Sequence, residues 1–135
     1  MLKTGKNTLR SNNVAKEKVA VLGASPKSER YSNKAIKALE ANGHEVYPVN
    51  PAYEDIDGRR VYDSLSALPE KIDTLTLYVA ADKIGPYVEE IIKLEPGRII
   101  MNPGTESREL MEALDSAGIA HTEACTLVML STKQF

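Results

Sequence analysis

Two basic side chains and three serines follow the first apolar segment of the chain. Lys27 and Arg30 carry the positive charges, and Ser25, Ser28 and Ser32 place hydroxyl groups around them. A helical pattern begins near Ser32, so unpaired backbone N–H groups and the positive end of a helix dipole reach the same place. This combination favours binding of an anion such as a diphosphate or a phosphorylated ribose. The alternative is a solvated turn in which the serines only start the helix.

The loop that carries these residues joins two apolar segments with the pattern of neighbouring parallel strands. Residues 19–22 form one continuous apolar run, as expected for a strand covered on both faces, and residues 46–49 form the second. Between them, apolar residues recur at helical spacing over residues 35–39, and Gly43 supplies a left-handed stop. The segment is therefore predicted to be a βαβ unit whose strand ends open side by side, a geometry that binds nucleotides in open sheets.

The alternation of helix and strand continues along the rest of the chain. It predicts strands at residues 75–79, 98–101 and 119–122, and helices that start at Asp82 and at Gly104 or Thr105. The predicted fold class is α/β, a Rossmann-like three-layer sandwich with a five-stranded parallel sheet in the order 3-2-1-4-5. In that order the topological switch point lies between the first and fourth strands. The loops that follow the first four strands are then expected to form a site at one end of the sheet.

Composition and charge limit the classes of protein to which this chain can belong. The 135 residues predict one domain, residues 16–135, preceded by a polar, flexible extension over residues 1–15. The net charge of −2 gives no general attraction to nucleic acid or to an anionic membrane. One cysteine excludes an internal disulfide framework, and no apolar run has the length of a signal-peptide core or a spanning helix. A cytoplasmic protein without nucleic-acid or membrane partners is predicted.

The dinucleotide fingerprint provides a test of the first loop. In register with G-x-G-x-x-G the chain reads Gly23-Ala24-Ser25-Pro26-Lys27-Ser28, so only the first glycine is present. Nicotinamide enzymes also place an acidic residue at the end of the second strand to bind the ribose hydroxyls. Here no carboxylate occurs there before Glu54. An ordinary dinucleotide site therefore fits this chain poorly.

A longer set of motifs carries a family resemblance. The motifs are Val21-Leu22-Gly23-Ala24-Ser25, Leu39-x-x-x-Gly43-His44-x-Val46, Pro48-Val49-Asn50-Pro51, Gly58, Tyr62-x-Ser64-Leu65-x-x-Leu68-Pro69 and Asp73. Together they resemble the small stand-alone coenzyme A-binding domain proteins, which are similar to the N-terminal domain of the succinyl-CoA synthetase α subunit. The resemblance covers nearly all of residues 18–130. It implies a Rossmann-like fold and a pocket for coenzyme A or an acyl-CoA.

The resemblance also implies which residues contact this cofactor. The residues expected to contact the phosphates are Gly23, Ala24, Ser25, Lys27, Arg30 and Asn33, together with Ser32 of the same segment. The adenine side comprises Val49, Asn50 and Pro51, with Tyr53 as a stacking lid. The ends of the third and fourth strands contribute Val79, Ala80, Ala81, Asn102, Pro103 and Gly104. The family's motif after the fourth strand runs aromatic-x-Gln-x-Gly, and the sequence Ile100-Met101-Asn102-Pro103-Gly104 departs from it on the pantetheine side.

Residue types that carry out catalysis or bind metals are sparse. His44 and His121 lack a second His or Cys at metal-ligand spacing, and Ser25 lacks a recognisable base. We therefore predict no catalytic and no metal-binding residue. Cys125 is either a small buried side chain or a partner for a mixed disulfide with the ligand thiol. The apolar segment at residues 127–130 either forms a dimer face or closes the core.

These observations favour a module that binds coenzyme A or an acyl-CoA, in a binding or regulatory role without its own catalysis. Its partners would be the small-molecule ligand and either a second protein or a second copy of the chain. Two other readings stay open. One is a small NAD(P)- or other nucleotide-binding enzyme with a Rossmann fold, and the other is an interaction protein that keeps the fold but has lost the ligand.

Overall fold

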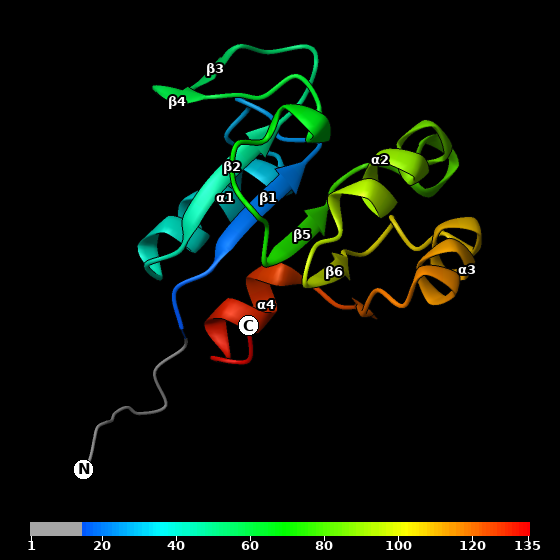
Figure 1. Ribbon diagram of the computed structural model, residues 1–135. Coiled ribbons are helices and arrows are strands. Elements are labelled where there is room, and N and C mark those ends of the chain that lie inside the picture. Colours follow the sequence, from blue (N-terminus) through cyan, green and yellow to red (C-terminus); the bar gives the residue numbers. More distant parts are fainter. Residues whose placement is uncertain (1–14) are drawn as a thin grey trace.

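A five-stranded parallel sheet lies at the centre of the computed structural model, which describes residues 15–135 (Figure 1). Its strands are β1 (Lys18–Leu22), β2 (Glu45–Val49), β5 (Thr74–Leu77), β6 (Arg98–Met101) and β7 (His121–Glu123). The helices are α1 (Tyr31–Ala41), α2 (Val88–Leu94), α3 (Arg108–Ala117) and α4 (Thr126–Ser131). The extension predicted for residues 1–15 lies outside the described residues except for Ala15. The predicted parallel sheet and Rossmann-like fold class are confirmed.

The position of one strand is corrected. The order 3-2-1-4-5 puts the third strand beyond the second, whereas β5 pairs directly with β1, so the five strands follow the order 2-1-3-4-5. Pro48 in β2 gives a physical reason, because its carbonyl accepts the Tyr62 N–H on the outer side of the strand. Its missing N–H belongs to that same side, which suits an edge strand. The switch point therefore lies between β1 and β5.

Helices cover both faces of the sheet, and the alternation of side chains along β1 serves both layers. Val19 and Val21 pack with Ile36 and Leu39 of α1 and with Leu130 of α4. Ala20 and Leu22 belong to the opposite cluster, which contains Ile84, Ile91, Leu110 and Leu114 from the segments around α2 and α3. Figure 1 shows α2 and α3 together on that side. Strands buried on both faces explain why their sequences are continuous apolar runs.

Helix starts differ from those predicted from apolar spacing. Helix α3 begins at Arg108 because the Ser107 hydroxyl accepts the Leu110 N–H at 3.2 Å and caps it, later than the predicted start at Gly104 or Thr105. Two 3-10 turns, η2 (Ala81–Lys83) and η3 (Gly85–Tyr87), precede α2, so that helix is shorter than predicted. Helix α4 closes the core through Leu130, which is buried. A dimer stays a prediction.

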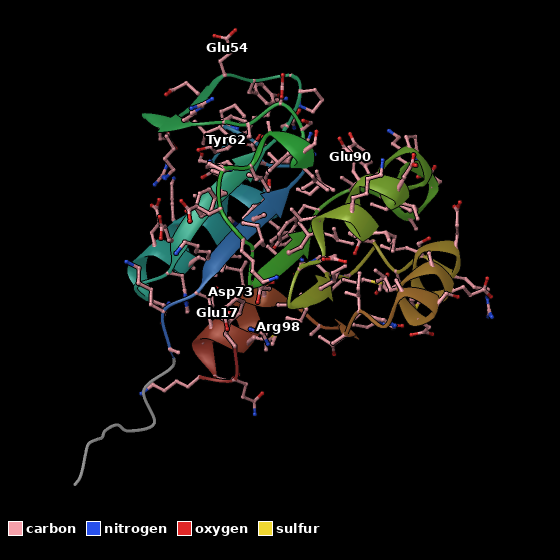
Figure 2. The ribbon with its side chains drawn as sticks, in the orientation of Figure 1. Glu17, Glu54, Tyr62, Asp73, Glu90 and Arg98 are labelled. Atoms are coloured by element: carbon pink, nitrogen blue, oxygen red, sulfur yellow. The ribbon has the colours of Figure 1, made fainter. Side chains whose placement is uncertain are left out.

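Charged residues gather at the amino ends of the strands. Figure 2 shows Glu17, Asp73 and Arg98 close together there. The Lys18 N–H donates to the Asp73 carboxylate at 2.8 Å, and Arg98 forms an ion pair with Glu17 at 3.4 Å. These contacts connect the starts of β1, β5 and β6. The predicted ligand loops lie at the other end of the sheet, so this cluster holds the strands in register without entering the site.

A short hairpin stands beside the carboxyl end of β2. It consists of β3 (Asp55–Ile56) and β4 (Arg59–Arg60), followed by the 3-10 turn η1 (Leu65–Ala67). The Arg59 guanidinium donates two hydrogen bonds to the Glu40 carboxylate of α1, at 2.8 and 2.7 Å. This bidentate pair ties the hairpin to the helix.

Candidate functional site

The loop between β1 and α1 is held between the ends of two other strands. The N–H groups of Gly23 and Ala24 both donate to the Val49 carbonyl at the end of β2, at 3.0 and 3.3 Å. On the other side, a Cβ on Gly23 would lie 2.7 Å from the Tyr78 carbonyl oxygen just after β5. Gly23 also has a φ of +89°, which side chains other than glycine rarely adopt. A glycine is therefore required where the chain turns into the loop.

Two asparagine side chains donate hydrogen bonds to backbone carbonyl groups of this loop. The Asn50 amide donates to the Ala24 carbonyl at 2.8 Å, and the Asn33 amide donates to the Ser25 carbonyl at 2.9 Å. Asn50 also accepts the Ala52 N–H at 2.8 Å, which shapes the turn after β2. These amides bind the carbonyls of Ala24 and Ser25, while the N–H groups of Gly23 and Ala24 bind Val49. The Ser25 N–H has no acceptor within the described residues, so it can donate to a ligand. That polarity suits an anion.

Positive charge accompanies these N–H groups. Lys27 and Arg30 are exposed, and within residues 15–135 neither forms an ion pair with an acidic side chain. The described part of the chain also holds no hydrogen-bond acceptor for the N–H groups of Ser25, Tyr31 and Ser32. The start of α1 and two cations thus lie beside one loop. The structure brings together the residues that the sequence predicted as a phosphate site.

Asn102 follows β6 and is buried, and its side chain bonds to other groups of the protein. Its side-chain nitrogen donates to the Thr76 hydroxyl at 2.6 Å and to the Leu77 carbonyl at 2.8 Å. Its side-chain oxygen accepts the Thr126 N–H at 2.8 Å. These bonds connect β5, β6 and α4, and they use the whole amide. Asn102 therefore acts as a positioning residue, and its carbonyl also accepts the N–H and the hydroxyl of Thr105, at 2.9 and 2.7 Å. Its contact with a cofactor stays a prediction.

A pocket of about 440 Å³ opens beside the β1–α1 loop, between the start of α1 and the start of α4. Its lining consists of Tyr31, Tyr78, Asn102, Pro103, Cys125, Leu127 and Val128. Asn102 and Pro103 were predicted as site residues, but the apolar wall from α4 was not. Residues 127–130 offered only an apolar run, which does not reveal that α4 folds back beside Tyr31. Burial raises the pKa of the Tyr78 hydroxyl to about 12.

The predicted adenine side forms a second, smaller hollow. Pro51 and Tyr53 line a pocket of about 270 Å³ together with the hairpin and the segment after it, including Glu54, Arg60 and Tyr62. Figure 2 shows Glu54 and Tyr62 at this end of the molecule. The Arg60 guanidinium lies 4.7 Å from the centre of the Tyr62 ring. Val49 is buried, so its side chain belongs to the core and only its carbonyl serves the loop.

The remaining predicted contacts follow β5 and β6. The Ala81 N–H donates to the Gly104 carbonyl at 3.3 Å and thereby joins the two loops. Val79 packs against the core on the α2 and α3 side. Ala80, Pro103 and Gly104 are exposed at this edge. The four loops named from the sequence therefore do meet at one end of the sheet, although their contact with a cofactor stays a prediction.

Groups with the chemistry of a catalyst do not converge on these loops. His44 is buried near the start of β2 and accepts the Glu17 N–H at 3.1 Å, while His121 pairs with Asp115 at 2.8 Å. Within residues 15–135 no group of three or more His, Cys, Asp or Glu side chains is arranged to hold a metal ion. The Ser25 hydroxyl accepts the Lys27 N–H at 3.1 Å and has no base beside it in the described residues. The Glu106 carboxylate reaches one of these loops, where it accepts the Gly104 N–H at 2.9 Å.

Comparison with protein families identifies the family of the chain. Residues 17–131 match the family model described as "CoA binding domain". The chain belongs to the CoA-binding domain family. The resemblance drawn from the sequence motifs is thus confirmed, and it spans nearly all of the described residues.

Relatives of this CoA-binding domain include a part of a much longer enzyme. The acetate–CoA ligase (ADP-forming) I of Archaeoglobus fulgidus is 30% identical over 125 residues, which cover 85% of this chain and 18% of the ligase. A crystal structure of an uncharacterized protein has 38% identity and a TM-score of 0.85, covering 90% of this chain and 100% of its own. A hypothetical protein from Pyrococcus horikoshii OT3 has 30% identity and a TM-score of 0.83, covering 96% and 99%.

The two solved structures are therefore similar to this CoA-binding domain over their whole length, whereas the ligase contains it as one portion. No helix within the described part of the domain has the length and apolar character needed to cross a membrane.

Proposed function

We propose that the protein binds coenzyme A or an acyl-CoA at the carboxyl edge of its sheet, as a binding or regulatory module that does not itself catalyse a reaction. The observation that carries the proposal is the pair of hydrogen bonds from Asn33 and Asn50 to the loop carbonyls. With these carbonyls occupied, the N–H groups of Ser25, Tyr31 and Ser32, which have no acceptor within the described residues, are the backbone groups left for an anion near Lys27 and Arg30. The diphosphate of coenzyme A is an anion of matching charge.

We propose that the two pockets hold the parts of the cofactor on either side of its diphosphate. The adenosine end is proposed to lie over the pocket that contains Pro51 and Tyr53. The pantetheine arm is proposed to run across the ends of β5 and β6 toward the pocket at Pro103 and Cys125. The larger pocket includes Tyr31, which follows the loop, and the smaller one includes Pro51, which follows Asn50, the residue that bonds the Ala24 carbonyl. A single extended ligand fits this arrangement better than a compact one.

The absence of catalysis is proposed from the side chains around the loop. Within residues 15–135 no group of three or more His, Cys, Asp or Glu side chains is arranged to hold a metal ion, and the Ser25 hydroxyl accepts the Lys27 N–H instead of bonding to a base. Of the nearby carboxylates, Glu29 is exposed to water and Glu106 accepts the Gly104 N–H. The related ligase is named for an activity on acetate and CoA, but the chain spans only 18% of that enzyme. We therefore propose that any reaction of the bound ligand is catalysed by a separate protein. The same proposal includes a protein partner or a homodimer. It also includes a cytoplasmic location.

Titration calorimetry of the full chain with coenzyme A, dephospho-coenzyme A, NAD and ATP tests the proposal. Coenzyme A is expected to bind most tightly. Dephospho-coenzyme A is expected to bind more weakly, because it lacks the 3′-phosphate that a basic side chain of the loop would contact. Preference for NAD over both would assign the chain to the nucleotide enzymes instead. Lack of binding by all four ligands would favour an interaction protein without a ligand.

Removal of the two positive charges tests whether coenzyme A binds at the β1–α1 loop. The double variant Lys27→Gln, Arg30→Gln is expected to weaken binding of coenzyme A by at least tenfold, because two charge-assisted contacts are lost. Lys37→Gln is the matched control, since Lys37 is an exposed residue of α1 farther from the loop. Equal weakening by both variants would show that only the overall charge matters, which contradicts the assigned site.

A further inference from the structure

The pocket of about 440 Å³ adjoins the phosphate loop directly. Tyr31, one of its lining residues, is the first residue of α1 and follows Arg30 of the loop. Tyr78, another lining residue, donates its N–H to the Leu22 carbonyl at 2.9 Å, and its own carbonyl lies against Gly23. The loop and the pocket thus share walls. A ligand bound by its diphosphate at the loop can extend into the pocket without crossing another element.

The pocket walls consist largely of carbon. Pro103, Leu127 and Val128 supply aliphatic surface, and Tyr31 supplies an aromatic ring. Asn102 has its whole amide engaged with Thr76, Leu77 and Thr126. The Tyr78 hydroxyl is buried, so it contributes no surface to the pocket. Apart from the Tyr31 hydroxyl and the Cys125 thiol, the lining side chains therefore give a polar ligand group no hydrogen-bond partner, which favours an apolar group.

The mouth of the same pocket carries apolar side chains that water reaches. Tyr31 is 67% exposed and Val128 is 55% exposed, and they are the large hydrophobic residues that stand exposed within residues 15–135. Scattered exposed apolar residues are ordinary, but here both lie on one rim. Their position indicates an apolar occupant that covers them. The volume is within the usual range for pockets that hold small ligands.

We propose that this pocket holds the hydrocarbon chain of an acyl-CoA, so that the preferred ligand is a thioester of a short or medium apolar acid rather than free coenzyme A. The inference rests on the proposed function, because the loop must first hold the diphosphate. The acyl chain packs between α1 and α4 and covers Tyr31 and Val128. The Cys125 thiol lines the pocket as part of its wall. Recognition of an acyl group would make the protein a sensor or carrier of acylated coenzyme A.

Titration of the full chain with coenzyme A, acetyl-CoA, butyryl-CoA and hexanoyl-CoA tests this inference. Affinity is expected to rise by about fourfold for each methylene added beyond acetyl, since a buried methylene contributes about 0.8 kcal/mol. Hexanoyl-CoA that binds no more tightly than coenzyme A would overturn the inference and leave the proposed function intact. Failure of every ligand, coenzyme A included, would overturn both.

A substitution at the mouth of the pocket tests whether the preference for an acyl chain arises there. Val128→Asn keeps a similar volume on an exposed residue and is expected to reduce the advantage of hexanoyl-CoA over coenzyme A by at least fivefold. Free coenzyme A, which lacks the acyl chain, is titrated with each protein as the reference for this ratio. Ala41→Asn, at the exposed far end of α1, is the matched control and should change neither affinity.

Two results with this variant would contradict the pocket assignment. Equal weakening of coenzyme A and hexanoyl-CoA by Val128→Asn would indicate a general disturbance of the site. Native mass spectrometry that shows a dimer in the parent protein and a monomer in Val128→Asn, with no preference for the acyl chain, would assign the exposed rim to a second copy of the chain instead.

Discussion

The side-chain nitrogen of Asn50 lies 2.8 Å from the carbonyl oxygen of Ala24, which is 26 residues earlier in the chain. This bond joins the turn after β2 to the loop after β1. Asn33 makes the corresponding bond to Ser25 from within α1. The loop is therefore fixed from both of its sides, by side chains that donate rather than accept. We therefore expect the proposed anion binding to depend on these two amides as well as on the nearby cations.

Replacement of Asn50 by Asp removes the donor and adds a negative charge next to the loop. We expect the variant Asn50→Asp to bind coenzyme A at least tenfold more weakly, because the Ala24 carbonyl loses its partner and the new carboxylate repels the diphosphate. Titration calorimetry measures the change. Asn42→Asp is the control, since Asn42 donates to the Ala38 carbonyl at the other end of α1. Matching losses in the two variants would contradict this role for Asn50.

The close approach of Gly23 to Tyr78 predicts an unusually costly substitution. Gly23 and Gly43 share a φ of +89°, but a Cβ on Gly43 would meet nothing within 4 Å. Gly43→Ala is expected to lower the free energy of unfolding by about 1 kcal/mol, from backbone strain alone. Gly23→Ala is expected to lose roughly 2 kcal/mol more, because its Cβ would overlap the Tyr78 carbonyl. Urea denaturation of both variants provides the comparison, and equal losses would refute the steric argument.

Asn102 is expected to determine stability before it affects binding. The variant Asn102→Leu keeps the branching and the number of side-chain heavy atoms but leaves the Leu77 carbonyl and the Thr126 N–H without their partner, which should lower the free energy of unfolding by roughly 2–4 kcal/mol. Chemical denaturation at neutral pH measures this loss. If the variant were as stable as the parent protein and bound coenzyme A more weakly, Asn102 would be a ligand contact instead of a positioning residue.

Burial of His44 makes stability depend on pH. Burial lowers the pKa of His44 below its usual value of 6.5, and Arg98 acts in the same direction while Glu17 opposes them. Since the folded pKa is lower than the unfolded one, the unfolded chain binds the proton more readily. Stability from this residue is therefore complete above about pH 6.5 and decreases as the pH falls through that value toward the folded pKa.

The variant His44→Asn isolates that dependence. An asparagine oxygen can still accept the Glu17 N–H, but it does not titrate. We expect the urea midpoint of the parent protein to decrease between pH 7 and pH 5 more steeply than that of His44→Asn. Parallel curves for the two proteins would show that His44 does not contribute to the pH dependence.

The sequence predicts the strands and the loops well because each depends on a short stretch of residues. Residues 19–22 and 98–101 are apolar throughout, as strands covered on both faces require. The place of β5 depends instead on which strand it pairs with, and apolar runs carry no information on pairing. Pro48 is the one local signal that was available, since a proline in a strand indicates an edge.

The pocket could not be predicted for a related reason. Helix α4 has six residues, and its apolar run fits a strand as well as a helix. Its position is determined by the bond from the Thr126 N–H to Asn102 and by burial of Leu130 against the first helix. The space between Val128 and Tyr31 arises only when these elements pack together. Spacing along the chain thus indicated the phosphate loop but not the apolar wall next to it.

The bonds from Asn33 and Asn50 to the loop have a consequence for the speed of ligand capture. Because folding itself orders the loop, its conformational entropy is lost before any ligand arrives. The loop then meets the ligand as a rigid receptor, and no slow rearrangement follows the encounter. Differences in affinity among its ligands should arise mainly from how slowly each one leaves.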